Sequence, residues 1–215
     1  MDKKEDFEII KQFGPSILKV KIPNDILNQI NTYVDNVIKD TELSKKLNYG
    51  NQLVGDVTQE IKLEPSIMQK SGWGNFLGLN VGKWIASELG EKITKFHIIE
   101  SWVVRQFKNE YNPIHWHSGH ISGAGFLKVP NLLGKHVQKK ENKTYKGGNL
   151  QLVHGTRMFL NNSTYTIEPK VGDFYFFPNY MMHVVYPFKN SEEERRSISF
   201  NAYIDEGIYN VYLGE

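Results

Sequence analysis

The feature that most constrains the fold of this chain is a series of short apolar runs that begins near Phe96. The runs are KFHIIESWVVRQF, ISGAGFLKV, GGNLQLV, STYTIEP, GDFYFFP, MMHVVYP and RRSISFNAYI. They are rich in β-branched and aromatic residues and are separated by Gly, Pro or Asn, which is typical of strands joined by turns. Because no helical pattern alternates with them, they predict a β-sandwich or β-barrel.

The first 95 residues carry mainly helical patterns. Apolar residues at steps of three and four predict one helix within residues 23–40, with Asn24 as its capping residue, and a second within residues 76–93. The stretch 41–75 between them is rich in Gly, Asn, Ser and Gln, and it predicts an irregular connection. Both helices are expected to pack against a sheet.

The composition excludes several classes of protein. With 26 basic and 24 acidic residues and a net charge of +2, the chain has no strong field, which argues against a nucleic-acid partner. The absence of cysteine excludes disulfides, thiolate metal sites and a cysteine nucleophile. The N-terminal MDKKEDFEII lacks the apolar core of a signal peptide, and no apolar run approaches the roughly 18 residues that span a membrane. We therefore expect a soluble, cytoplasmic protein without a membrane partner, of open oligomeric state.

Three of the seven histidines, His115, His117 and His120, fall within six residues. Positions i and i+2 of an extended segment point to the same side, so His115 and His117 can bind one metal ion and leave other coordination positions open. A non-haem iron site takes a further ligand from another strand, and His183 is the candidate, in an apolar run where a histidine without a partner is costly. The alternatives are a chance cluster in a polar loop and an ordinary core histidine.

The run ERRSISFNAY places polar side chains on one face of a strand, because Arg195, Ser197, Ser199 and Asn201 alternate with other residues. An arginine and a serine two residues apart can hold a carboxylate together, through a guanidinium fork and a hydroxyl. Arg195 and Ser197 are two residues apart and so face the same side of the strand, which favours Arg195 over Arg196 as the carboxylate-binding residue. A register slip of one residue would exchange the roles of the two arginines. The alternative is an exposed edge strand with both arginines in solvent.

These residues together resemble the iron(II)- and 2-oxoglutarate-dependent oxygenases, over residues 97–204. Each motif alone has low specificity, but the order and spacing of all of them are fairly specific. The matching elements are Asn112, the His115-Trp116-His117 pair, Ser122-Gly123, Pro130, Gly172-Asp173, Phe177-Pro178, His183, Pro187 and the run from Arg195 to Asn201.

The resemblance implies a mainly β fold with N-terminal helices: a double-stranded β-helix, which is a jelly-roll or cupin-like barrel. Residues 96–215 would form this catalytic core and residues 1–95 a helical elaboration packed on it, within one domain. The implied activity is that of a dioxygenase that hydroxylates an unactivated C–H bond. It would use iron(II), with 2-oxoglutarate and O2 as cosubstrates, and would convert 2-oxoglutarate to succinate.

The same resemblance implies that iron binds at His115, His117 and His183. It implies that Arg195 and Ser197 bind the tail carboxylate of 2-oxoglutarate, with Asn201 lining the cosubstrate pocket. No residue beyond the metal ligands is expected to act as a catalytic acid or base.

One departure from the family concerns the first histidine pair, which in most members reads His-x-Asp or His-x-Glu. A second histidine at His117 leaves three neutral imidazoles, so the protein itself would not compensate the charge of the ion. Alternatively, one histidine of the pair does not touch the metal, and His120 or a carboxylate completes the site. Asp173 is the nearest carboxylate in the sequence, but its Gly-Asp context predicts a turn residue and not a ligand.

The surroundings of the site are less constrained by the sequence. Trp116, Tyr175, Phe177 and Tyr186 are candidate pocket walls, or else core aromatics. The lysine-rich segment 131–148 predicts either a solvated loop or a mobile lid. The substrate could be a small molecule or a peptide side chain. Two other functions stay open: a cupin-type three-histidine enzyme without 2-oxoglutarate, and a non-enzymatic β-barrel binding module.

Overall fold

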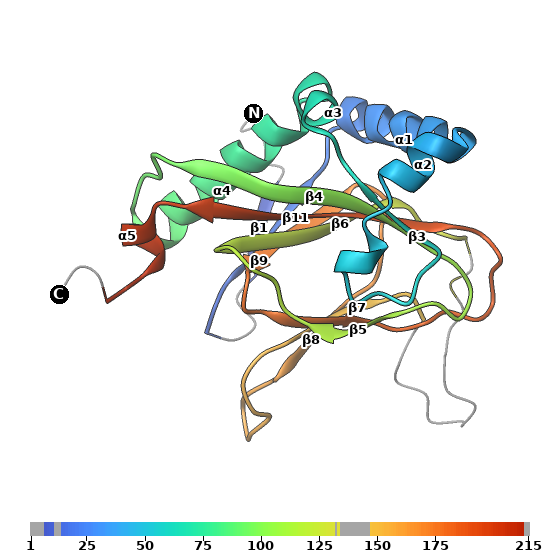
Figure 1. Ribbon diagram of the computed structural model, residues 1–215. Helices are drawn as coiled ribbons and strands as arrows, with labels where there is room; N and C mark the ends of the chain where they lie inside the picture. The colour runs from blue at the N-terminus through green and yellow to red at the C-terminus, as the bar shows by residue number, and fades with distance from the viewer. Residues whose placement is uncertain (1–6, 11–13, 132, 134–146, 213–215) are drawn as a thin grey trace, which may run out of the picture.

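The computed structural model describes residues 7–10, 14–131, 133 and 147–212. Its strands form two antiparallel sheets, one of seven strands in the order β1-β2-β9-β6-β11-β4-β3 and one of four in the order β5-β10-β7-β8. In Figure 1 the smaller sheet lies beneath the larger one, and the helices cover the opposite face of the larger sheet. The structure therefore has the layered antiparallel architecture that the series of short strands predicts.

From residue 96 onward each predicted run contains a strand, and β5 is a further strand that lies outside those runs. The larger sheet consists of β1 (Phe7–Ile10), β2 (Ile17–Lys21), β9 (Asp173–Pro178), β6 (Ile121–Lys128), β11 (Arg195–Ile204), β4 (Phe96–Gln106) and β3 (Gln59–Lys62). The smaller sheet consists of β5 (Asn112–His115), β10 (Met182–Val185), β7 (Leu150–Val153) and β8 (Thr164–Ile167).

Two long helices cover the larger sheet where the apolar periodicity predicts them. They are α1 (Asn24–Lys39) and α4 (Trp73–Leu89), accompanied by the short helices α2 (Thr41–Lys46), α3 (Pro65–Lys70) and α5 (Glu206–Tyr209) and the 3-10 turn η1 (Gly50–Gln52). Trp73 of α4 packs edge-on against Phe174 of β9, with ring centroids 5.2 Å apart, and its indole N–H donates to Ser101 Oγ at 3.0 Å. No helix among the described residues is both long and apolar enough to cross a bilayer.

Three details of the N-terminal expectation are corrected. Asn24 is the first residue of α1 and makes no capping bond, because Pro23 occupies the capping position. The stretch 41–75 is not irregular, since it contains α2, η1, β3 and α3. The first 95 residues also contribute strands β1, β2 and β3 to the larger sheet, in segments too short to show a clear alternation.

The domain division at residue 95 stays a prediction. Most of the 131–148 loop, predicted to be a solvated loop or a lid, lies outside the described residues.

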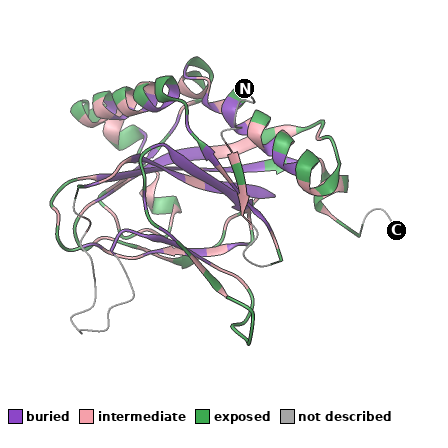
Figure 2. Ribbon diagram, turned by 180° about the vertical axis from the view of Figure 1, so that it is seen from behind, coloured by how far each residue is buried: buried purple, intermediate pink, exposed green. Residues whose placement is uncertain are grey.

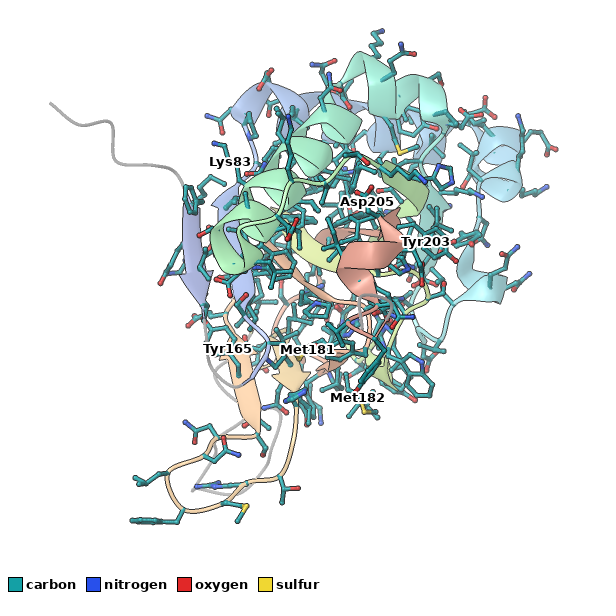
Figure 3. The ribbon with its side chains drawn as sticks, turned by 90° about the vertical axis from the view of Figure 1, so that its left-hand side faces the viewer. Lys83, Tyr165, Met181, Met182, Tyr203 and Asp205 are labelled. Atoms are coloured by element: carbon teal, nitrogen blue, oxygen red, sulfur yellow. The ribbon has the colours of Figure 1, made fainter. Side chains whose placement is uncertain are left out.

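Two apolar cores hold the layers together. The first joins α1 and α4 to the helix-facing side of the larger sheet, including Phe174, Phe176 and Phe200. The second lies between the two sheets and includes Phe177 and Met181; Met181 is labelled in Figure 3. Figure 2 shows the buried residues concentrated in the central strands of the larger sheet. The second core fills only part of the space between the sheets, and the remaining part is a polar cavity.

The close packing of the sheet and helix layers around β6 gives a first prediction. A Cβ atom at Gly123 would lie 2.7 Å from Phe174 Cε1 and 2.8 Å from the Tyr175 carbonyl oxygen. We expect Gly123→Ala to lower the free energy of unfolding by about 1–3 kcal/mol through overpacking, measured by urea denaturation. Gly207→Ala is the matched control, because nothing lies within 4 Å of a Cβ at Gly207. Equal stability of the two variants would contradict this prediction.

Candidate metal centre

The cavity between the sheets has a volume of about 210 Å³ and is lined by residues from both sheets. The predicted metal ligands His115, His117 and His183 all line it. His115 ends β5, and His183 lies in β10 directly opposite His115 in the antiparallel ladder. This strand pairing brings the two histidines together across a long stretch of sequence.

His117 lies just after the end of β5 and is held in place by the turn that follows β9. The His117 N–H donates to the Asn179 carbonyl at 3.0 Å, and the Asn179 side-chain amide donates to the His117 carbonyl at 3.1 Å. The indole ring of Trp102 packs against the His117 imidazole, with centroids 5.4 Å apart. The backbone bonds and the ring contact together orient the imidazole into the cavity.

The hydrogen bonds of the other two histidines define which nitrogen is free. His115 Nδ1 donates to the Pro113 carbonyl at 2.7 Å, and His183 Nδ1 donates to the Met181 carbonyl at 2.9 Å. A carbonyl oxygen can only accept, so each Nδ1 carries the proton and each Nε2 keeps its lone pair. This is the tautomer that a metal-binding histidine needs.

Each of the three histidines offers one ring nitrogen as a ligand, and these three nitrogens lie within 4.8 Å of one another. His117 Nε2 lies 3.2 Å from His183 Nε2. Two nitrogens bound at about 2.1 Å in neighbouring positions of an octahedron are separated by about 3 Å, so this spacing suits a shared ion. The donor set therefore fits a divalent transition metal with its remaining positions facing the cavity.

Burial keeps all three imidazoles uncharged. It lowers the pKa of His115, and it lowers the pKa of His117 to about 3, with a further contribution from the charge of His115. Burial, followed by the charges of His115 and His117, also moves the pKa of His183 well below its ordinary value. Neutral imidazoles at physiological pH are the form that binds metal.

The central strand β11 supplies the second part of the cavity. Arg195, Ser197, Ser199 and Asn201 all line it, as their alternation predicts. Arg196 points to the other side, where its guanidinium bonds Asp35 at 2.7 Å and Glu194 at 2.9 Å. The register is therefore the predicted one, and Arg195 rather than Arg196 reaches the cavity.

Arg195 is a buried cation that lacks an acidic partner among the described residues. Only 1% of its surface is exposed, and burial lowers its pKa to about 10. Its Nε donates to the Gly148 carbonyl at 2.9 Å, its Nη1 lies 3.3 Å from Ser197 Oγ, and its guanidinium lies over the Phe126 ring. A buried guanidinium without a carboxylate is costly, so the site is arranged to receive an anion.

Two carboxylates that line the cavity were missed by the sequence reasoning. Glu100, on β4, accepts hydrogen bonds from the Asn201 amide at 2.8 Å and from the Tyr49 hydroxyl. Glu60, on β3, is buried, and its Oε2 has no hydrogen-bond partner in the described part of the chain. A charged residue inside the otherwise apolar run KFHIIESWVV was a signal for Glu100, whereas the short strand around Glu60 carried none.

Several other candidates lie outside the cavity. His120 stacks on Tyr209, with ring centroids 3.8 Å apart, and its Nε2 lies 3.3 Å from Glu206, so it packs helix α5 against the sheet. Asp173 is the first residue of β9 and not the turn residue that its Gly-Asp context predicted, and it pairs with Lys21 and Lys19.

Of the four predicted aromatic walls, only Trp116 is among the described residues that line the cavity. Tyr175 and Phe177 belong to the core between the sheets, and the Tyr186 hydroxyl lies 3.4 Å from Gln151 Oε1. Trp102 and Phe126 line the cavity in their place. The alternation of residues in a strand shows which side chains face the other sheet. It does not show whether they meet the apolar core or the cavity there, so the aromatic residues that line the cavity could not be identified from the sequence.

Comparison with known proteins connects this geometry to a family. Residues 100–201 match the family model described as "Putative 2OG-Fe(II) oxygenase". No curated protein sequence matches the chain. Similar solved structures include a prolyl-4-hydroxylase from Pseudomonas putida, at 13% identity with a TM-score of 0.57, covering 92% of this chain and 93% of that one.

Two further structures share the fold. One is the viral collagen prolyl hydroxylase of Paramecium bursaria Chlorella virus-1 in a 2-oxoglutarate complex, with 16% identity, a TM-score of 0.51, and coverage of 93% of this chain and 96% of that one. The other is a prolyl hydroxylase from Trichoplax adhaerens in complex with a hypoxia-inducible-factor peptide fragment, with 13% identity, a TM-score of 0.56, and coverage of 97% and 88%. At these identities the likeness shows the fold.

The two facing sheets thus form a double-stranded β-helix, or jelly roll, as predicted. Within this fold, residues 100–201 match the model of the iron(II)- and 2-oxoglutarate-dependent oxygenases, which supports the resemblance seen in the sequence. This match and the three-histidine cluster together indicate an oxidoreductase that uses iron(II), with 2-oxoglutarate and O2 as cosubstrates.

The buried Glu60 carboxyl gives a prediction about stability. Burial raises its pKa from 4.5 to about 7, so the unfolded chain ionises first as the pH rises. The contribution of Glu60 to stability is therefore complete below about pH 4.5 and is lost progressively up to about pH 7, by at most about 3 kcal/mol. Glu60→Gln removes this loss. We expect the free energy of unfolding of the variant, minus that of wild type, to increase between pH 5 and pH 8.

Urea denaturation at several pH values between 5 and 8 measures this difference. The control is Glu42→Gln, which changes an exposed glutamate in the same part of the chain. Its difference from wild type is expected to stay flat with pH. A flat difference for Glu60→Gln as well would show that the carboxyl titrates normally and would refute the prediction.

Proposed function

We propose that this protein is an iron(II)- and 2-oxoglutarate-dependent hydroxylase that oxidises an unactivated C–H bond. His115, His117 and His183 would hold the iron, and Arg195 with Ser197 would bind the tail carboxylate of 2-oxoglutarate. In the net reaction one atom of O2 enters the substrate as hydroxyl, the other enters succinate, and 2-oxoglutarate loses CO2. Bound iron supplies the oxidising chemistry that no side chain here can provide.

The observation that carries the proposal is the buried Arg195, which has no acidic partner in the described part of the chain and lines the same cavity as the three histidines. A metal enzyme of cupin type without 2-oxoglutarate would leave this buried guanidinium without a purpose. A cosubstrate carboxylate supplies the missing counter-charge through a bidentate fork, and the Ser197 hydroxyl beside Nη1 can add a further bond.

The charges of the site support the same conclusion. Three neutral imidazoles leave the charge of a divalent ion uncompensated by its protein ligands. 2-Oxoglutarate carries two negative charges, one for the metal side and one for the Arg195 side. Metal and cosubstrate therefore stabilise each other in this cavity, and we expect the binding of each to be strengthened by the other.

The protein's own contribution is orientation and shelter. The Pro113 and Met181 carbonyls hold the His115 and His183 rings in the binding tautomer, and the indole of Trp102 restrains His117. Asn201 lines the cavity between Ser122 and Glu100, and its predicted contact with the cosubstrate stays a proposal. No side chain needs to act as an acid or base.

The metal centre is tested by binding. Wild-type protein is expected to bind one Mn(II) or Fe(II) per chain, measured anaerobically by calorimetry, and His183→Ala to weaken this binding at least 100-fold because it removes one of three ligands. His97→Ala, at an exposed histidine of β4, is the control and should bind as wild type does. Unchanged metal binding in His183→Ala would place the ion elsewhere.

The cosubstrate site is tested by a pair of matched substitutions on adjacent residues of β11. Arg195→Lys loses the guanidinium fork, and we expect the KM for 2-oxoglutarate in succinate release to rise about tenfold. Arg196→Lys affects the ion pairs with Asp35 and Glu194 and should change stability while leaving this KM unchanged. If both variants had the wild-type KM, 2-oxoglutarate would bind elsewhere. Metal binding without any 2-oxoglutarate turnover would favour the cupin-type enzyme.

A further inference from the structure

The cavity contains a second unpartnered group, Glu60, for which the metal and the cosubstrate provide no use. Only 2% of Glu60 is exposed, it lines the cavity, and its Oε2 has no hydrogen-bond partner among the described residues. Asn112 lines the same cavity, and its buried Oδ1 is also unpartnered. Nearly all buried polar atoms in proteins are hydrogen-bonded, so two unsatisfied acceptors in one cavity indicate a missing donor.

The two side chains converge beneath one segment of backbone. A Cβ atom at Gly55 would lie 2.2 Å from Asn112 Oδ1 and 3.0 Å from Glu60 Oε1, so only glycine allows this approach. The segment is attached to both sheets, because Asp56 pairs with Tyr111 beside β5 and Glu60 itself lies in β3. The acceptors are therefore held in position by the fold.

The distribution of charge indicates what the donor is. Among the described residues, Arg195 is the only lysine or arginine that lines the cavity, and its salt bridge to Glu60 is absent. Glu100 lines the cavity as well, with its carboxylate bonded by Tyr49 and Asn201. A neutral donor would satisfy a hydrogen bond but leave the Glu60 carboxylate without a counter-charge. A cation with several N–H groups satisfies both requirements.

The residues at the opening of the cavity indicate what kind of chemical group the cation is attached to. Trp116 and Val54 line the cavity and are nevertheless 66% and 55% exposed. Leu53 lines it beside Val54. Apolar side chains at an opening suit an aliphatic chain, and a charged nitrogen at the end of such a chain is the structure of lysine and arginine side chains.

We infer that the substrate carries an ammonium or guanidinium group on an aliphatic stem, and that Glu60 and Asn112 bind that group. The inference rests on the proposed function, which it deepens by naming the substrate class. The substrate is then a basic amino acid, either free or as a residue of a peptide. Glu60 selects the substrate by charge and takes no part in the oxidation.

Matched pairs of probes test the inference. L-arginine is compared with L-citrulline, its uncharged counterpart, and L-lysine with L-norleucine. N-acetylated, C-amidated Gly-Arg-Gly and Gly-Lys-Gly test the peptide source, and Gly-Pro-Gly in the same form represents a prolyl substrate. Binding to protein loaded with Mn(II) and 2-oxoglutarate is measured by calorimetry, and succinate release is measured with iron and O2.

We expect at least one cationic probe to bind at least tenfold more tightly than its neutral counterpart and to accelerate succinate release. Glu60→Gln should bring the ratio of the two affinities, cationic probe over neutral counterpart, close to one. A merely structural role of Glu60 would not change this ratio. Glu42→Gln, at an exposed site, should keep the wild-type preference. Preference for the free amino acids or for the peptides distinguishes the two sources.

Three results would overturn the inference: equal binding of charged and neutral probes, binding of the prolyl peptide alone, and a charge preference that survives Glu60→Gln. The inference would also be overturned if none of the probes bound to the protein. Failure of the proposed function gives a different signal, because wild-type protein would then show no metal-dependent binding of 2-oxoglutarate before any probe is added.

Discussion

The site depends first on the pairing of two short strands, β5 and β10. In an antiparallel ladder directly opposed residues have Cβ atoms about 5 Å apart, and His115 and His183 are such a pair. Their rings lie 4.2 Å apart, and β10 is held in the interior of the smaller sheet by β7 on its other side. A register change of one residue would turn His183 to the opposite face and break up the cluster of three histidines.

Around this pair, the central strand β11 separates two environments. Ile198 and Phe200 face the helical layer, while Arg195, Ser197, Ser199 and Asn201 face the cavity. The cavity therefore contains buried groups that the described protein residues do not neutralise, a guanidinium at Arg195 and a carboxyl at Glu60. Such groups lower the stability of the empty protein, and each favours a ligand of opposite charge. This is the expected compromise between stability and binding in an active site.

Much of the fold could be predicted from residue 96 onward, because each strand there except β5 lies in a continuous run bounded by turn residues. The convergence of the three histidines and the choice of Arg195 over Arg196 as the arginine that faces the cavity also followed from local spacing and from motifs in a recognisable order. Strands β1, β2 and β3 could not be predicted in the same way. They have four or five residues each, and their conformation is stabilised by pairing, of β1 with β2, of β2 with β9 and of β3 with β4, more than by a pattern of their own.

The sequence by itself determined the properties that depend on nearest neighbours along the chain: the period of the helices, the alternation of β11, and the i, i+2 spacing of His115 and His117. Only the tertiary structure decided which distant groups share the cavity. Glu60, Glu100 and the Gly55 segment reach it through strand pairing and the layering of two sheets. The physical reason is that side-chain direction is a local property of the backbone, whereas burial, pKa and the lack of a partner depend on what packs around a residue.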